Sequence, residues 1–212
     1  MRRTITDEMA RKAAAELARR DKVLAPVIAA AGLCTIRPHG EYYRELVDSI
    51  VSQQLSVKAA ASIFKKFLAL FGDEFPSPEE ILAKPAEDFR GVGLSNAKAA
   101  YIRDLARHVI DGKLAFDDLD SLSNEQVVAR LVGVRGIGEW TAHMFLMFCM
   151  GRPDVLPHGD LGIRNGTQKL YGLDKLPSKA EIEQIARDNR WSPYESIASW
   201  YVWRSLNNAP NL

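Results

Sequence analysis

Three closely spaced glycines, Gly133, Gly136 and Gly138, lie in the stretch LVGVRGIGEWTA, where their backbone could bind a ligand. Glycine permits positive φ, and without a Cβ it lets another backbone or a ligand approach closely. The flanking patterns predict a helix at about 124–132 and a second helix directly after the turn. N–H groups at the start of that second helix would suit an anion such as a DNA phosphate. A tight helix–helix turn with only a packing role is the alternative.

A carboxylate, Asp160, lies about twenty residues further on, in the Gly- and Pro-rich stretch RPDVLPHGDLGIRNG. Its position predicts the N-cap of a helix from Leu161 to Leu170, closed by Gly172. A carboxylate held at such a place could also stabilise developing positive charge or orient a water molecule. The two roles do not exclude each other.

Nearly every other segment reads as a helix with an identifiable start. Thr6, Asp21, Ser56 and Ser95 precede helical runs as N-cap residues. Three capping boxes are expected, at Ser123-x-x-Gln126, Ser178-x-x-Glu181 and Ser192-Pro193-Tyr194-Glu195. No alternating run is long enough for a sheet. The sequence therefore predicts an all-α protein with about ten short helices.

Composition narrows the class of protein. The chain has 212 residues with a net charge of +1, so any binding of DNA needs locally concentrated positive charge. Two cysteines, Cys34 and Cys149, are too few for a disulfide framework or a four-thiolate metal site, and their apolar surroundings predict buried, reduced thiols. We find no signal peptide or membrane span and expect a cytoplasmic protein.

The order G-I-G-x-W-T-A, followed by Asp160 in P-x-x-D-L-G-I, resembles the helix–hairpin–helix DNA glycosylases with a Gly/Pro-rich loop and an aspartate, in particular the 3-methyladenine DNA glycosylase II (alkylpurine) branch. Two positions depart from that pattern: Arg135 replaces the usual proline of the hairpin, and Gly159 replaces the first of two adjacent acids. The resemblance implies two all-α lobes with an active-site cleft between them. Residues 40–152 would form one lobe, ending in the hairpin at about 124–150, and residues 1–39 plus 153–212 the other.

The resemblance also implies a base pocket. Asp160 would be the catalytic carboxylate, and Trp140, Tyr194 and Met144 would line the pocket. Family members that also cut the DNA backbone carry a lysine where this chain has Trp140, so the chain resembles a monofunctional glycosylase. Trp140 could instead stack on a flipped cationic base, with a role in the core as the alternative. Trp191, Trp200 and Trp203 are expected in the core or the pocket walls.

A second set of residues is implied in DNA binding. The string SIVSQQLSVKAA resembles a family segment in which one residue fills the gap left by the flipped nucleotide, here Gln54; solvated turn residues are the alternative. Lys98 is expected as a solvated helical lysine, with a phosphate contact as the alternative. The implied DNA contacts are Gln53, Gln54, Ser56, Arg135, Gly136, Gly138 and Thr141. The carbonyls of Val132, Val134 and Ile137 would hold a structural Na⁺ or K⁺, and no other cofactor is required.

The implied activity is hydrolysis of the N-glycosidic bond of alkylated purines in double-stranded DNA, chiefly N3-methyladenine and also N7-methylguanine. The enzyme would flip the base, leave an abasic site and act as a monomer. Two alternatives stay open: a glycosylase for oxidised or mismatched bases, and a non-catalytic helix–hairpin–helix protein that contacts only the DNA backbone.

Overall fold

The computed structural model describes residues 4–206, and the portions of the predicted second lobe at 1–3 and 207–212 lie outside that range. Every regular element in the described range is helical, which confirms the all-α prediction. The chain divides into two compact units, one made of the residues up to Gly40 together with those from Leu146 onward, the other of Glu41–Phe145. The lobe boundaries inferred from the sequence remain a prediction.

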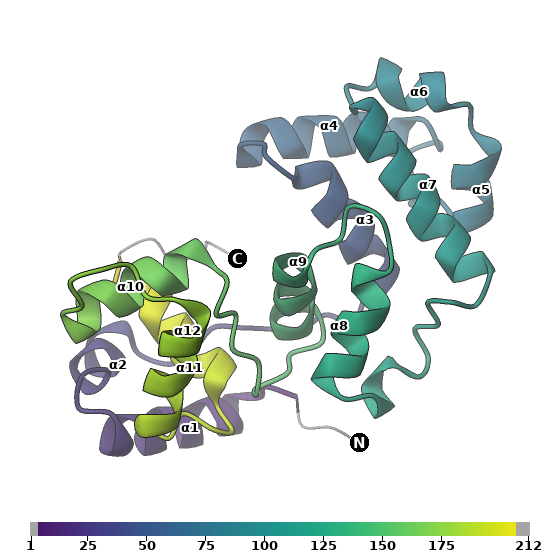
Figure 1. Ribbon diagram of the computed structural model, residues 1–212. Helices are drawn as coiled ribbons and strands as arrows, with labels where there is room; N and C mark the ends of the chain where they lie inside the picture. The colour runs from purple at the N-terminus through teal and green to yellow at the C-terminus, as the bar shows by residue number, and fades with distance from the viewer. Residues whose placement is uncertain (1–3, 207–212) are drawn as a thin grey trace. The chain divides into compact units, whose positions relative to one another are not determined.

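Between residues 4 and 206, the first unit contains five α-helices; the first two are purple in Figure 1, and the last three run from green to yellow. They are α1 (Asp7–Arg20), α2 (Ala25–Ala31), α10 (Leu161–Tyr171), α11 (Lys179–Asp188) and α12 (Glu195–Arg204). Helix α12 is buried along almost its whole length and packs against α1, α2 and α10. Burial of an entire helix around all its faces makes α12 the centre of this unit's core.

The second unit contains seven α-helices and a 3₁₀ turn, all between Glu41 and Phe145. They are α3 (Tyr42–Ser52), α4 (Val57–Ala69), α5 (Pro78–Ala83), α6 (Ala86–Gly91), α7 (Asn96–Ile110), η1 (Leu119–Ser121), α8 (Asn124–Val132) and α9 (Glu139–Met144). Helix α7 packs against α3, α5 and α6 (Figure 1). A π-helical turn, η2 (Phe145–Cys149), follows α9, and the division between the two units falls after its first residue.

Side-chain caps fix most helix starts, as the sequence predicts. Thr6, Ser56 and Ser95 each accept a hydrogen bond from the backbone N–H three residues ahead. The capping boxes at Ser123 and Ser178 are both present. Because each cap satisfies an otherwise unbonded N–H, these residues contribute about 1 kcal/mol apiece to helix stability.

Two predicted helix starts are wrong. Helix α12 begins at Glu195 with Tyr194 as its N-cap, and Ser192 forms no capping box. Helix α2 begins at Ala25, because the carboxylate of Asp21 caps the preceding turn through the N–H groups of Val23 and Leu24. Its other oxygen accepts hydrogen bonds from the Tyr171 hydroxyl and, at 2.8 Å, from Trp191 Nε1. A long-range polar contact of this kind leaves no periodic signal in the sequence.

Cys34 and Cys149 are both buried thiols, as predicted. Burial raises the pKa of the Cys34 thiol to about 11. Within the described residues, no helix combines the length and apolar character needed to cross a membrane.

Candidate active site and nucleic-acid interface

Asp160 lies at the N-terminus of α10, where a turn closed by the Asp160 N–H and the Pro157 carbonyl (2.9 Å) leads into the helix. Its Oδ1 accepts a hydrogen bond from the Ile163 N–H at 2.8 Å. The helix ends at Tyr171, and Gly172 adopts the left-handed conformation at φ 63°. The predicted N-cap role is therefore confirmed, and the side chain is half-buried rather than fully solvated.

The same oxygen of Asp160 has a second donor that sequence reasoning missed. Trp203 Nε1 donates to Oδ1 at 2.8 Å, and the indole stacks on Phe148 with ring centroids 5.8 Å apart. A Cβ on Gly162 would lie 2.9 Å from Trp203 Cδ1, so a glycine at the second position of α10 is needed for the indole to reach the carboxylate. The available signal was general: a buried Trp normally finds a partner for its N–H.

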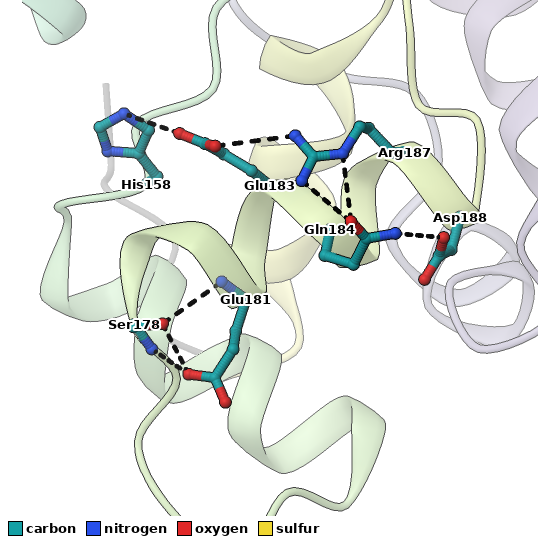
Figure 2. A network of polar contacts seen from close by, with 7 residues as sticks. All are labelled: His158, Ser178, Glu181, Glu183, Gln184, Arg187 and Asp188. Carbon is teal, nitrogen blue, oxygen red and sulfur yellow. Dashed lines mark hydrogen bonds and ion pairs between the residues drawn. The ribbon is translucent and has the colours of Figure 1, made fainter.

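Helix α11 contacts the loop that precedes Asp160. Figure 2 shows the polar contacts along that helix, including the one between His158 of the loop and Glu183. His158 Nε2 lies 3.6 Å from a carboxylate oxygen of Glu183, whose other oxygen lies 3.7 Å from Arg187. Arg164 Nε donates to the Pro177 carbonyl at 2.8 Å, which ties α10 to the segment before α11. Both contacts restrict the backbone on either side of Asp160.

Tyr194, predicted to line the base pocket, is buried with only 5% of its surface exposed. Its hydroxyl donates to Glu16 Oε1 at 3.4 Å, and the Arg20 guanidinium lies 5.9 Å from the ring centroid. Both partners are on α1, so Tyr194 connects the start of α12 to that helix. Its contact with a base stays a prediction.

The glycine turn joins α8 and α9 as predicted, and its conformation depends on one glycine above the others. Gly136 has φ 87°, and a Cβ there would lie 2.2 Å from Tyr101 Cδ2, so the Tyr101 ring rests directly on the backbone. The Arg135 N–H donates to Asp104 Oδ2 at 2.9 Å. Both contacts come from α7, which therefore supports the hairpin.

Gly138 differs from Gly136 because the fold itself does not demand a glycine there. Its φ of −98° is open to any residue, and a Cβ would meet nothing within 4 Å. It is exposed, as is Arg135. An exposed glycine at a helix N-terminus leaves room for a closely approaching ligand.

The carbonyls predicted to hold a cation belong to one turn of backbone. Val134 and Ile137 are buried while Val132 is 43% exposed, and the Val134 carbonyl accepts the Ile137 N–H at 3.1 Å. A carbonyl oxygen has a second lone pair, so this hydrogen bond does not by itself prevent the Val134 carbonyl from binding a cation. The cation remains a proposal.

Helix α9 carries the predicted pocket residues of the second unit. Trp140 is 52% exposed, an unusual position for so large an apolar side chain, and Met144 follows one helical turn later, half-buried. Thr141 is only 7% exposed, so its predicted DNA contact has little side-chain surface available. The convergence of Trp140 with Tyr194 and Asp160 stays a prediction, since Trp140 belongs to a different compact unit.

The segment predicted to fill the gap left by the flipped nucleotide, around Gln54, lies in the turn between α3 and α4. Gln54 is exposed and left-handed, with φ 57°, and Ser56 caps α4. Gln53 Nε2 donates to the Gly136 carbonyl at 2.8 Å. The interpretation of Lys98 as a solvated lysine is wrong: its Nζ donates to the carbonyls of Val51 and Gln53, both at 2.7 Å, and burial lowers its pKa.

Comparisons with known proteins show the family of this chain. The family model described as "HhH-GPD superfamily base excision DNA repair protein" matches residues 47–191. The chain is 37% identical over 167 residues to DNA-3-methyladenine glycosylase 1 of Schizosaccharomyces pombe, covering 78% of this chain and 72% of that protein.

Two solved structures are similar over nearly the whole chain. A DNA-3-methyladenine glycosidase of Bacillus halodurans has a TM-score of 0.82 and 36% identity, covering 90% of this chain and 87% of that one. A 3-methyladenine DNA glycosylase of Schizosaccharomyces pombe in complex with abasic DNA has a TM-score of 0.77 and 34% identity, covering 91% and 95%. With the hairpin, the Gly/Pro-rich loop and its aspartate in place, this chain belongs to the HhH-GPD superfamily of base excision DNA repair proteins.

Proposed function

We propose that the protein is a base-excision-repair DNA glycosylase that hydrolyses the N-glycosidic bond of alkylated purines in double-stranded DNA. N3-methyladenine is the principal substrate, with N7-methylguanine as the second. The observation that carries the proposal is the Asp160 carboxylate, held at a helix N-terminus by the Ile163 N–H and Trp203 Nε1 in a member of this family. Relatives named as 3-methyladenine glycosylases support the substrate class.

The chemistry follows from charge. As the bond between C1′ and the base nitrogen breaks, its electron pair leaves with the base and positive charge develops on the sugar. A carboxylate fixed beside that charge stabilises it without reorganisation. A water oxygen then bonds to C1′, and its proton passes to Asp160 or to solvent. An alkylated base that is already cationic becomes neutral on leaving, so one carboxylate suffices.

Other residues have supporting roles in this proposal. Trp140 stacks on the flipped base, with Met144 and Tyr194 as further walls, and Gln54 fills the vacated space. Trp140 provides no amine for a Schiff base, so the product is an intact strand with an abasic site. The hairpin binds phosphate, aided by Na⁺ or K⁺ on the carbonyls of Val132, Val134 and Ile137. We further propose a monomer located in the cytoplasm.

The experiment that tests the function is base release from methylated duplex DNA, with every released base identified, by the wild type and by Asp160→Asn. Asparagine is as good an N-cap as aspartate, so the variant isolates the charge from the cap. We expect release of 3-methyladenine by the wild type, a loss of at least ~10²-fold in the variant, and equal melting temperatures.

Other outcomes identify the alternatives. Release of oxidised or mismatched bases from matching substrates, with none of the alkylated ones, would assign the other glycosylase class. Absence of release from any of these substrates, with equal DNA binding by both proteins, would leave a backbone-binding module in which Asp160 is only a cap.

A further inference from the structure

Gln53 is held at both its backbone and its side chain. Its carbonyl accepts a hydrogen bond from Lys98 Nζ at 2.7 Å, which also binds the Val51 carbonyl and so completes the end of α3. Its side-chain Nε2 donates to the Gly136 carbonyl at 2.8 Å, in a segment 83 positions away. One residue thus connects the turn after α3 to the glycine hairpin.

The hairpin end of this connection is held by the same helix that provides Lys98. Tyr101 packs on the Gly136 backbone, and Asp104 accepts the Arg135 N–H at 2.9 Å. Lys98, Tyr101 and Asp104 are spaced three residues apart along α7 and therefore follow one another on one side of that helix. The turn after α3 and the hairpin consequently share a single support, and Gln53 bridges the two.

Gln54, directly after this bridge, is exposed and left-handed at φ 57°. A non-glycine residue in that conformation costs about 1 kcal/mol and persists only where its neighbours impose it. The neighbouring constraint is the double anchoring of Gln53. The direction in which Gln54 leaves the protein surface is therefore set by the bonds that Gln53 makes to Lys98 and Gly136.

We propose that Gln53 is a positioning residue that holds Gln54 at a fixed distance from the hairpin. Gln54 then fills the gap in the duplex while the hairpin binds the backbone of the same duplex. The proposal rests on the proposed function, in which Gln54 occupies the place of the flipped nucleotide. The Gln53 side chain then acts on DNA through Gln54 and Gly136. Loss of the hydrogen bond between Gln53 and Gly136 gives Gln54 more freedom to move. Misplacement of a substrate-positioning residue by about 1 Å can lower a rate by ~10²-fold.

The test compares single-turnover base release by the wild type, Gln53→Met, Gln54→Ala and the double variant. Methionine keeps the length of glutamine and removes the donor to Gly136. We expect Gln53→Met to lower the rate on duplex DNA by ~10-fold or more, to change the rate on single-stranded DNA little, and to add almost nothing in the Gln54→Ala background. Fully additive losses would overturn the proposal, because residues that act independently show no coupling.

Lys98 supplies a second, independent variant. Lys98→Met removes both bonds to the end of α3 and should resemble Gln53→Met, whereas Lys98→Arg keeps a donor and should restore most of the rate. Melting temperatures identify any variant that fails to fold. A fully active Lys98→Met that folds normally would contradict the shared support.

Amide hydrogen exchange in the free protein separates this proposal from the proposed function. We expect faster exchange at the hairpin amides and around Gln54 in Gln53→Met, with α10 to α12 unchanged. Unchanged protection at those amides would overturn the coupling whatever the enzyme does. Absence of base release by the wild type, with the exchange difference present, would overturn the proposed function and leave the bridge as a property of the fold.

Discussion

Trp203 and Asp160 are joined by a hydrogen bond of 2.8 Å between Nε1 and Oδ1, across 43 positions of sequence. Trp203 is 6% exposed and its ring is stacked on Phe148, so its N–H has little freedom to turn away. The carboxylate that caps α10 is thereby oriented from a second helix. This relationship makes the position of the proposed catalytic group depend on α12 as much as on its own loop.

Replacing Trp203 by phenylalanine should keep the ring stack on Phe148 and remove the donor to Asp160. We expect kcat for base release to fall by ~10-fold with KM nearly unchanged, since orientation of the carboxylate is lost but DNA contacts are not. Steady-state kinetics on a duplex with one alkylated purine measures both constants. Trp200→Phe is the matched control, because Trp200 is also a buried tryptophan of α12. Its ring meets the Tyr201 ring edge to face. Equal losses in both variants would mean that only packing matters.

Gly136→Ala and Gly138→Ala should separate folding from DNA binding at the hairpin. At Gly136 the positive φ and the Tyr101 ring oppose a Cβ, so we expect a loss of ~2 kcal/mol or more and a fall in Tm of several degrees. At Gly138 nothing opposes a Cβ, so Tm should stay constant while affinity for duplex DNA falls by ~10-fold as the methyl blocks phosphate. Calorimetry and fluorescence anisotropy check the pair. Unchanged DNA affinity in Gly138→Ala would argue against phosphate binding at this turn.

Gly166→Ala should destabilise the first unit. A Cβ there would lie 2.5 Å from Val202 Cγ1 and 2.8 Å from the Val202 carbonyl, so α10 and α12 must separate. We expect a loss of ~1–3 kcal/mol in denaturant unfolding. Gly159→Ala is the control, because its nearest neighbour is the flexible Lys179 side chain at 3.5 Å. Similar stability of both variants would show that the two helices tolerate separation.

Glu195 should make stability depend on pH. Its Oε2 is buried without a hydrogen bond from the described residues, and burial, with Asp154 nearby, raises its pKa above the ordinary 4.5. A carboxyl with a raised pKa in the folded state opposes folding once it ionises, so this cost is absent below pH 4.5 and grows as the pH rises through the folded-state pKa. Glu195→Gln should therefore match the wild type in acid and melt higher at neutral pH.

Glu181→Gln provides a control of opposite sign. Hydrogen bonds from Ser178 lower the pKa of Glu181, so its contribution to stability is present above pH 4.5 and lost as the pH falls below it. Any cost of this substitution should appear only at neutral pH. Thermal melts of both variants across the acid range make the comparison, and a neutral-pH Tm of Glu195→Gln below that of the wild type would contradict the assignment.

Local signals in the sequence were sufficient for most of the fold. A capping serine or threonine followed by helical spacing located α1, α4, α7, α8 and α11, because caps act within three residues. Helices α5 and α6 were missed, although Ser77-Pro78-Glu79-Glu80 carries a capping box with proline at the first helical position. These helices have only six residues each and lack a full hydrophobic period.

The local conformations at the candidate site were predictable from the sequence, whereas its long-range hydrogen bonds were not. Asp160 and the glycine turn follow from spacing, since a cap and a positive φ are local properties. The partners of Trp203, Lys98 and Gln53 lie tens of residues away, and nothing in a single sequence registers which distant carbonyl or carboxylate a side chain will meet. Lys98 shows the difference: its helical position was evident, but its two carbonyl partners come from the end of another helix.

Gly162 and Gly166 leave α10 with almost no side-chain layer where α12 crosses it. Engineering of this protein toward other lesions is therefore limited by the α10–α12 contact, which leaves no room for larger side chains. We expect a larger side chain at either glycine, or a reshaped one at Val202 or Trp203, to displace the helix that carries the proposed catalytic carboxylate and so to lower turnover on every substrate alike. Selection for a new base preference is therefore expected to collect substitutions on α9, around the exposed Trp140 and the half-buried Met144, and to leave the α10–α12 contact untouched.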